Sequence, residues 1–324
     1  MPANNSITVL KTPPIAARRD FHTAMYAFYS SEYDAIITDP AHMQVPVDDH
    51  LVHRGDGVFE TLKCVDGRVY CLEEHLDRLY YSAKEIALVP PVSREAVRHS
   101  ILETIRAGGH RDCLARVLLS RGVGSMGISP LDCPRAGLYI LAHKTVAPFM
   151  ETHPGGAHLI TSNMPVKAGF FATIKTCNYL PNALMKKEAI DRGADFAVNF
   201  DEAGFLAEGA TENIGIVDAN SWLVIPQPGR ILPGTTMQRA YELASQGVAA
   251  KWITGKKTSA IRREDLLDSR EILIFGTTTN VTAVTRLDGR LVGDGRPGAV
   301  SIKLGKLLLA EQTSDNPFAV RAFA

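Results

Sequence analysis

The clearest periodic pattern of apolar and polar positions lies in residues 73–88, EEHLDRLYYSAKEIAL. Its apolar residues recur at helical spacing, at Leu76, Leu79, Tyr80, Ala83 and Ile86. This spacing predicts an amphipathic helix with one apolar face. A second helix is predicted over residues 93–109, because Ser93 is a favoured N-cap residue and glycines end the segment.

Strand patterns occupy the rest of the first half of the chain. The segment GVFETLKCVDGRVYCL, residues 57–72, has two β-rich runs around Asp66-Gly67. This dipeptide is a strong turn signal, so the segment predicts a β-hairpin. Four further apolar runs predict strands, at residues 35–40, 43–49, 114–122 and 136–144.

The two halves of the chain divide at TVAPFMETHPGG, where prolines and paired glycines predict a linker over residues 146–156. We predict a small α/β domain before it, over residues 1–145. Within that domain, residues 1–30 carry no strong pattern and are expected to form an extension that packs on the body. A larger cofactor-binding domain is predicted over residues 157–324, and both lengths are ordinary for domains.

The second half mixes strands and helices. Residues 195–226 alternate and turn like an antiparallel meander. Because strands and helices do not alternate regularly as βαβ units, the pattern favours an α+β fold over a doubly wound sheet. The other predicted elements are helices at residues 181–193, 234–248 and 298–312 and strands at 157–163 and 270–276.

Composition is typical of a globular protein. The 324 residues are 45% hydrophobic, and 35 basic side chains balance 35 acidic ones. A formal net charge of zero argues against a general binder of nucleic acid or membrane. We find neither a signal-peptide core nor an 18-residue apolar run, and we therefore expect a cytoplasmic protein. The five cysteines are scattered without a C-x-x-C pair, so neither a disulfide framework nor a metal site is expected.

Lys175 stands in an unusual place for a lysine. It follows the apolar run GFFATI, residues 169–174, and precedes the helix predicted at 181–193. The common alternative is a surface lysine at a strand–helix junction, because lysine is almost never buried without a partner. In the chemical interpretation, a buried strand end holds a Schiff-base lysine, since burial lowers the amine pKa and leaves more of the neutral nucleophile.

Other polar groups also have an ordinary and a chemical interpretation. Glu208 is either an outward strand carboxylate or the partner of a cationic ring nitrogen. Thr235 and Thr236 form either a plain helix cap or an anion site of free N–H groups. Arg78 is either a solvated group on a helix face or a phosphate ligand. The segment FGTTTNV, residues 275–281, is either a polar turn or a site for phosphate or carboxylate. Taken together, a lysine, a ring-nitrogen carboxylate and several phosphate donors suggest pyridoxal phosphate.

Seven motifs carry a resemblance to a known family. In chain order they are HRGDGVFETL, EEHLDRLYYSA, IKTCNYLPNALMKKEA, AEGATENIGIV, ILPGTTMQ, FGTTTNVTAV and DGRLVGDGRPGAVSIKL. On these motifs the chain resembles the class IV aminotransferases, the fold-type IV pyridoxal-phosphate enzymes. The resemblance implies a two-domain α+β fold with the cofactor between the domains. It also implies a homodimer in which loops of one subunit close the site of the other.

The resemblance also implies which residues act. Lys175 is expected to form the Schiff base with the cofactor and to move the substrate α-proton, and Glu208 to bond the pyridine nitrogen. The other implied cofactor-binding residues are Arg78, Thr235, Thr236 and Thr277 at the phosphate and Tyr179 near the ring. The implied reaction moves an amino group between an amino acid and a 2-keto acid.

Two features bear on the branch of the family. Branched-chain enzymes usually read Phe-Glu-Gly-Ile-Arg where this chain has FETLK, residues 59–63. They also usually place three residues between lysine and asparagine, whereas KTCN, residues 175–178, has two. The segments PVDDHLVHRGDGVFET and FATIKTCNYLPNAL are similar to plant D-amino-acid transaminases. We rank D-amino-acid transamination first, aminodeoxychorismate lyase second and branched-chain L-amino-acid transamination third, with an inactive cofactor-binding scaffold as the non-enzyme alternative.

Bacillus-type D-amino-acid enzymes bind the substrate carboxylate with an Arg and a His in the loop after RG, and this chain lacks both residues. Here that loop is RGVGSMGIS, with Met126 and Ile128 near those places. Another group is therefore expected to bind the carboxylate, either Arg54 or Lys63 or the Thr277–Thr279 backbone. A solvated charge at a strand end is the alternative for both cations. The predicted substrate-binding residues are Arg54, Phe59, Lys63, Met126, Thr278 and Thr279.

Overall fold

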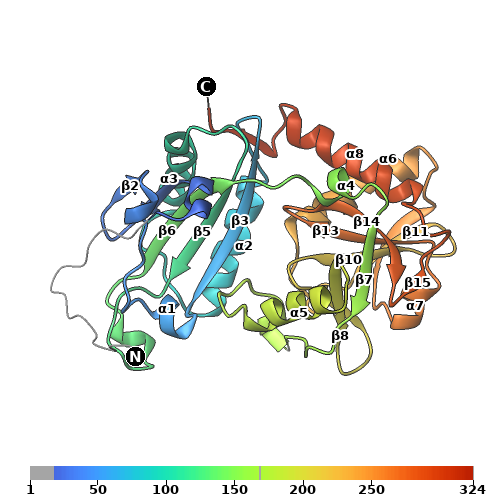
Figure 1. Ribbon diagram of the computed structural model, residues 1–324, viewed down its shortest axis with the longest axis horizontal. Coiled ribbons are helices and arrows are strands. Elements are labelled where there is room, and N and C mark those ends of the chain that lie inside the picture. Colours follow the sequence, from blue (N-terminus) through green and yellow to red (C-terminus); the bar gives the residue numbers. More distant parts are fainter. Residues whose placement is uncertain (1–17, 168, 324) are drawn as a thin grey trace, which may run out of the picture.

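The computed structural model describes residues 18–167 and 169–323. Two β-sheets, each with its own helices, form two lobes that lie side by side (Figure 1). The first sheet consists, in spatial order, of β16 (Ala319–Arg321), β4 (Arg68–Tyr70), β3 (Gly57–Val65), β5 (Cys113–Ser120), β6 (Gly137–Lys144), β1 (Met25–Ser30) and β2 (Ala35–Ile37). All its pairings are antiparallel.

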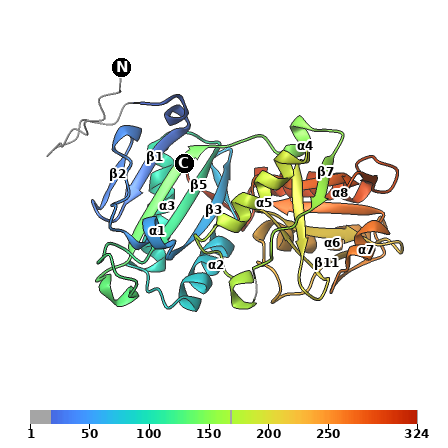
Figure 2. The ribbon, with the colours of Figure 1, turned by 60° about the horizontal axis from the view of Figure 1, so that its bottom comes forward.

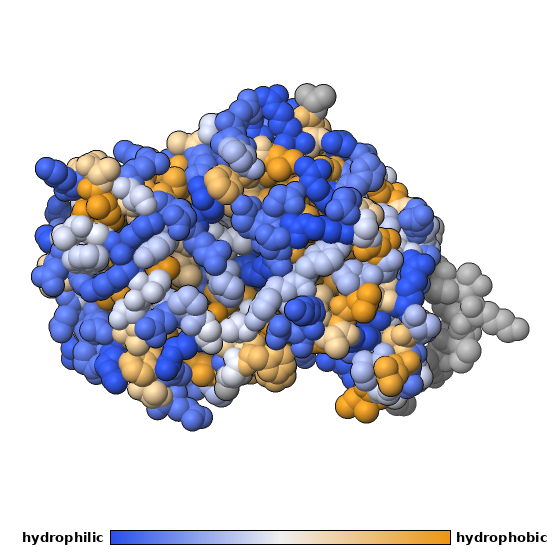
Figure 3. All heavy atoms as spheres, turned by 180° about the vertical axis from the view of Figure 1, so that it is seen from behind, coloured by the Kyte–Doolittle hydropathy of each residue, from blue (hydrophilic) through white to orange (hydrophobic). Residues whose placement is uncertain are grey.

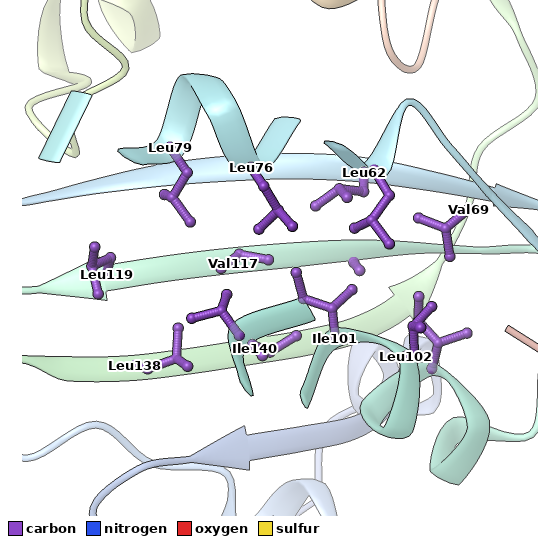
Figure 4. Close-up of a cluster of buried hydrophobic side chains, with 14 of the residues drawn as sticks. Leu62, Val69, Leu76, Leu79, Ile101, Leu102, Val117, Leu119, Leu138 and Ile140 are labelled. Atoms are coloured by element: carbon purple, nitrogen blue, oxygen red, sulfur yellow. The ribbon is translucent and has the colours of Figure 1, made fainter. Parts of the chain in front are cut away.

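Two helices, α2 (Leu72–Glu85) and α3 (Arg94–Gly108), cover one face of the first sheet. Both agree with the helical patterns in the sequence, and the Ser93 hydroxyl accepts a hydrogen bond from the Ala96 N–H at 3.2 Å, as expected of an N-cap. Figure 4 shows apolar side chains of the two helices meeting those of the strands. The buried residues labelled there are Leu62, Val69, Leu76, Leu79, Ile101, Leu102, Val117, Leu119, Leu138 and Ile140.

The predicted hairpin is confirmed, because β3 and β4 pair antiparallel around Asp66 and Gly67, which both have positive φ. Two other expectations were wrong. Residues 25–30 are not part of a patternless extension but form β1, which is paired with β6 and β2; residues 1–17 lie outside the described part. The strand expected at 43–49 is irregular chain, which includes Pro46, a residue that cannot donate to a strand ladder.

The second sheet is mixed. Its strands, in spatial order, are β12 (Gly255–Ser259), β11 (Trp222–Pro226), β10 (Asn213–Val217), β13 (Glu271–Gly276), β14 (Asn280–Leu287), β7 (Ala157–Thr161), β8 (Phe196–Phe200) and β9 (Leu206–Gly209), with β15 (Arg290–Leu291) beside β14. Strand β7 runs parallel to both of its neighbours, and β8–β9 and β10–β11 are antiparallel pairs. The α+β class is therefore confirmed. The predicted meander was wrong, because residues 195–226 form two separate antiparallel hairpins, β8–β9 and β10–β11, and β10 pairs with β13 rather than with β9.

The helices of the second lobe are α5 (Leu180–Asp191), α6 (Thr235–Ala249), α7 (Arg263–Leu267) and α8 (Ala299–Thr313). The long helices α6 and α8 pack on one face of the sheet, against Leu273 and Phe275 of β13. The remaining short helices are α1 (His50–Arg54), α4 (Phe149–Thr152), η1 (Asp20–Ala24), η2 (Pro40–His42), η3 (Pro130–Asp132) and η4 (Gly169–Ala172).

The chain connects the lobes twice. It leaves β6 at Lys144, passes through α4 and enters β7 at Ala157, and after α8 it returns to the first sheet as the edge strand β16 (Figures 1 and 2). Tyr70 and Cys71, at the end of the first sheet's β4, pack in the same apolar cluster as α6 and α8. The two lobes therefore share a buried contact beside their common boundary.

Hydrophobic side chains on the face seen in Figure 3 occur as separate groups among hydrophilic ones. Over residues 18–167 and 169–323, no helix has both the length and the apolar character needed to cross a membrane.

Candidate active site

The backbone of Lys175 is held against the first sheet, although Lys175 itself is not at the end of a strand. The run before it forms the 3₁₀ helix η4, so the expected strand there was wrong. The Lys175 carbonyl accepts from the Phe59 N–H at 2.9 Å, and its own N–H donates to the Ser82 hydroxyl at 3.1 Å. An isolated bridge between Val58 and Thr176 continues this contact. Short apolar runs do not distinguish a strand from a turn of helix.

The Lys175 amine lies between aromatic rings, in a partly buried side chain. Its Nζ lies 3.2 Å from the Tyr179 hydroxyl and 4.7 Å from the centre of the Phe59 ring. Burial first, and then the positive charge of Arg78, lower the pKa of the Lys175 amine from 10.5 to about 8. Near neutral pH a useful fraction of the amine is therefore neutral and nucleophilic.

A cavity of ≈ 180 Å³ opens beside this amine. It lies between the sheets, because Phe59 and Thr61 come from β3 and Thr277 and Thr278 from the turn after β13. The complete set of lining residues is Phe59, Thr61, Arg116, Lys175, Tyr179, Thr211, Thr277 and Thr278. Five residues expected from the sequence thus meet at one cavity: Phe59, Lys175, Tyr179, Thr277 and Thr278.

Glu208 is a largely buried carboxylate on β9, with 16% of its side chain exposed. Burial raises the pKa of its carboxyl group, while the positive charges of Lys167 and Lys175 oppose that shift. One carboxylate oxygen accepts from the Leu232 N–H at 3.3 Å, and the other lies 3.5 Å from Lys167 Nζ. Glu208 is thus a carboxylate inside the protein and within the electrostatic field of the Lys175 amine.

The N-terminus of α6 lies close to Arg78. Helix α6 begins at Thr235, and its N-cap residue Gly234 supplies no side-chain cap, so N–H groups of the first turn remain open. A Cβ at position 234 would collide with the Asn213 side chain. The Arg78 guanidinium donates to the Pro233 carbonyl at 3.0 Å, which brings a cation to this helix end. Open N–H groups, a helix dipole and a cation together suit an anion.

These groups fit pyridoxal phosphate. The amine of Lys175 suits an aldehyde, the carboxylate of Glu208 suits a ring nitrogen, and the start of α6 suits a phosphate. Thr279, next to the cavity residue Thr278, has a buried hydroxyl oxygen without a hydrogen-bond partner among the described residues. Buried polar groups normally have partners, so this hydroxyl is available for a ligand.

Four residues predicted to bind substrate do not line the cavity: Thr279, which only adjoins it, and Arg54, Lys63 and Met126. The Arg54 guanidinium donates to the backbone carbonyls of Met126 and Gly127, at 2.5 and 3.0 Å. Lys63 is buried with its Nζ 3.3 Å from the Asn280 side-chain oxygen. Met126 has an exposed side chain. Arg54 and Lys63 are therefore not solvated charges at strand ends, which was the alternative interpretation of both residues.

Sequence reasoning missed Arg116, which lines the cavity. It lies on β5 directly opposite Thr61 of β3, and its guanidinium carbon is 5.7 Å from the centre of the Phe59 ring. The available signal was a single arginine inside the apolar run LARVLLS. Sequence reasoning also missed Glu60 and His75, which are almost fully buried beside Arg78.

The chain matches the family Amino-transferase class IV over residues 57–287. The chloroplastic D-amino-acid transaminase of Arabidopsis thaliana is 36% identical over 90% of this chain and 78% of its own. A protein named putative branched-chain-amino-acid aminotransferase, of Methanocaldococcus jannaschii, is 32% identical over 82% of this chain and 90% of its own. A D-alanine aminotransferase of Listeria monocytogenes is 29% identical over 83% of this chain and 96% of its own.

Solved structures agree with these relatives. A T.th. branched-chain amino acid aminotransferase with pyridoxamine 5′-phosphate superposes with a TM-score of 0.85 at 27% identity, covering 92% of this chain and 99% of that one. The chain therefore belongs to the class IV aminotransferase family. It is a fold-type IV enzyme, and its cofactor is pyridoxal phosphate.

Proposed function

We propose that this enzyme transfers the amino group of a D-amino acid to a 2-keto acid. The observation that carries the proposal is the 36% identity to a D-amino-acid transaminase over 90% of the chain. The two-residue spacing in KTCN, residues 175–178, supports it, as do relatives named D-alanine aminotransferase.

In this proposal, Lys175 and Glu208 carry the chemistry. The neutral Lys175 amine would hold the cofactor and, once displaced by substrate, would take the α-proton on Nζ as a general base and deliver it as a general acid to the carbon of the former cofactor aldehyde. Glu208 holds the proton of the cofactor ring nitrogen. Bound pyridoxal phosphate supplies the electron sink for the electrons left on the substrate α-carbon. Tyr179, within 3.2 Å of Lys175 Nζ, orients that amine.

The phosphate roles follow from the start of α6 and its neighbours. We assign the phosphate to the N–H groups of Thr235 and Thr236, to Arg78 and to the hydroxyl of Thr277. Arg78 lies beside Pro233, two residues before α6, and Thr277 lines the cavity that contains Lys175. The hydroxyls of Thr278 and Thr279 remain for the substrate.

We assign the substrate carboxylate to Arg116. This guanidinium and the Lys175 amine lie 5.7 Å and 4.7 Å from the Phe59 ring centre, on the wall of one cavity. An amino acid bound next to Lys175 has its carboxylate one bond from the α-carbon, so a cation on the same wall is well placed to bind it. Arg54 instead anchors the 126–127 backbone, and Lys63 is bonded to Asn280.

Branched-chain transamination is the second candidate. It is favoured by the match to branched-chain enzymes, which includes the 0.85 TM-score and the 32% identity of a putative one. The ring of Phe59 in the cavity wall is compatible with an aliphatic substrate side chain.

A substrate panel separates these candidates. The holoenzyme is tested with D- and L-alanine, D- and L-glutamate, L-leucine, aminodeoxychorismate and R-1-phenylethylamine, each with 2-oxoglutarate or pyruvate as acceptor. Higher kcat/KM for D-alanine or D-glutamate than for every other donor is the expected result. Preference for L-leucine selects the branched-chain candidate, and pyruvate release from aminodeoxychorismate without an acceptor selects the lyase.

Arg116→Leu tests the carboxylate site. A hydrogen bond to a charged group contributes about 1.5–3 kcal/mol, so KM for the preferred amino acid should rise at least about 10-fold. Affinity for the cofactor should not change, and Arg116→Lys should restore part of the loss. Arg98→Leu on α3 is the control, because it removes a half-exposed arginine paired with Glu73. A wild-type KM in Arg116→Leu would remove Arg116 from the site.

We also propose a homodimer in the cytoplasm. The loop after β5 presents exposed apolar side chains at Met126, Ile128 and Leu131, which favours a contact with a second copy. Light scattering after size exclusion should give twice the chain mass, and a monomer mass would refute the dimer. The Arabidopsis relative is named as chloroplastic, so fractionation of the source cells is the test of location.

A further inference from the structure

A buried charged cluster lies behind the start of α6. Glu60 of β3 and His75 and Arg78 of α2 are 1%, 3% and 8% exposed. Both carboxylate oxygens of Glu60 accept from Arg78, through Nε and a terminal nitrogen, each at 2.7 Å. The same carboxylate lies 2.7 Å from His75 Nδ1. The other nitrogen of that ring, Nε2, lies 3.3 Å from the hydroxyl oxygen of Thr235.

The ionisation of this cluster sets the direction of its hydrogen bonds. Burial raises the pKa of Glu60, but the charge and hydrogen bonds of Arg78 outweigh it and bring the pKa to about 2, so Glu60 is ionised. Burial lowers the pKa of His75 despite the nearby Glu60, which keeps the ring neutral. A neutral ring has one N–H, and the Glu60 carboxylate requires it on Nδ1. Nε2 is then an acceptor, and the Thr235 hydroxyl donates to it.

Two consequences follow for the helix end. The hydroxyl of Thr235, the first residue of α6, is tied to α2 through His75, which orients the first turn and its open N–H groups. Arg78 has five N–H donors, of which two bond to Glu60 and one to Pro233. The other two remain for a ligand. Because the charge of Glu60 neutralises that of Arg78, the binding of an anion at this helix end depends on aligned hydrogen-bond donors more than on net charge.

We propose that Glu60 and His75 are positioning residues for the phosphate group of the cofactor. Glu60 fixes the guanidinium of Arg78 and, through His75, the hydroxyl of Thr235, so that both face one phosphate. This inference rests on the proposed phosphate role of Arg78 and Thr235. It predicts that the two residues act on the phosphate and leave the contacts of the cofactor ring unchanged.

Binding of two cofactor forms isolates that effect. Pyridoxal phosphate and pyridoxal carry the same aldehyde and ring and differ in the phosphate, so the ratio of their dissociation constants for the cofactor-free protein reports on the phosphate site alone. Equilibrium dialysis measures both constants without any turnover.

His75→Asn is the central variant. Its amide nitrogen reaches the place of Nδ1 and keeps a donor to Glu60, but nothing replaces the Nε2 acceptor. Affinity for pyridoxal phosphate should fall about 10-fold, the factor for 1.4 kcal/mol, while affinity for pyridoxal stays constant. His75→Gln, whose amide reaches the place of Nε2, should restore part of the loss. Glu60→Gln, which also releases Arg78, should reduce the ratio further.

Controls keep the test decisive. Thr235→Val removes the same hydrogen bond from the other side with little change of shape, and it carries the test if His75→Asn does not fold. His50→Asn is the matched control, since His50 is equally buried but contacts the Ser125 carbonyl instead. Equal weakening of both cofactor forms, or a wild-type ratio in His75→Asn or Thr235→Val, overturns the positioning role. A ratio near one in the wild-type protein instead overturns the phosphate role of Arg78 and Thr235 itself.

Discussion

Cofactor capture by Lys175 should follow a titration centred near pH 8. Burial and the Arg78 charge lower the pKa of this amine from 10.5 to about 8, and only the neutral amine attacks an aldehyde. With that pKa, the neutral fraction is about 9% at pH 7, about 50% at pH 8 and about 91% at pH 9. The rate at which cofactor-free protein captures pyridoxal phosphate should therefore rise about 10-fold between pH 7 and pH 9 and then level off.

Stopped-flow growth of the visible absorbance of the bound cofactor measures this rate. An amine with the ordinary pKa of 10.5 would instead give a rise of about 100-fold over the same range, without a plateau. That steeper curve would refute the shifted pKa. Lys175→Ala should give no visible band, and borohydride reduction with peptide mapping should label residue 175. A label on Lys167, the neighbour that contacts Glu208, would show that the wrong lysine was assigned.

Two further predictions concern the carboxylates of Glu208 and Glu60. Glu208→Gln should retain the cofactor but lower kcat about 100-fold, or about 3 kcal/mol, because an amide does not hold the ring nitrogen protonated; an unchanged single-turnover rate would exclude Glu208 from the mechanism. Glu60 has a folded pKa of about 2 against 4.5 in the unfolded chain, so its contribution to stability is present above pH 4.5 and is lost as the pH falls toward 2. It amounts to about 3 kcal/mol. Urea unfolding should show less acid sensitivity in Glu60→Gln than in the wild type, and equal sensitivity would contradict the assignment.

Local patterns in the sequence were sufficient for most helices and for the hairpin. The apolar spacing in residues 73–88 predicted α2, and Ser93 predicted the start of α3. Both predictions hold because helix periodicity and capping depend on residues that are close in the sequence. Asp66-Gly67 marked the β3–β4 turn for the same reason. The motifs around Lys175 and Glu208 indicated the family and the cofactor, since the chemistry of a lysine and a carboxylate depends on their residue types.

The tertiary structure decided which residues meet. Arg116 and Phe59 are far apart in the chain, and only the pairing of β3 with β5 places them on one wall of the cavity. Likewise, Lys175 is held by backbone bonds to β3 rather than by a strand of its own. Residues 25–30 became a strand because β6 and β2 supply its partners.

The cluster at Glu60, His75 and Thr235 could not be predicted from the sequence for the same reason. In the sequence, Glu60 is one polar residue in a strand and His75 one polar residue in a helix. Their charge states depend on burial and on the Arg78 guanidinium, which the fold brings within 2.7 Å of the Glu60 carboxylate. The sequence thus determined the chemical groups and the local elements. Distances, burial and hydrogen-bond direction arose only when separate elements packed together, because electrostatic and hydrogen-bond energies depend on spatial rather than sequence separation.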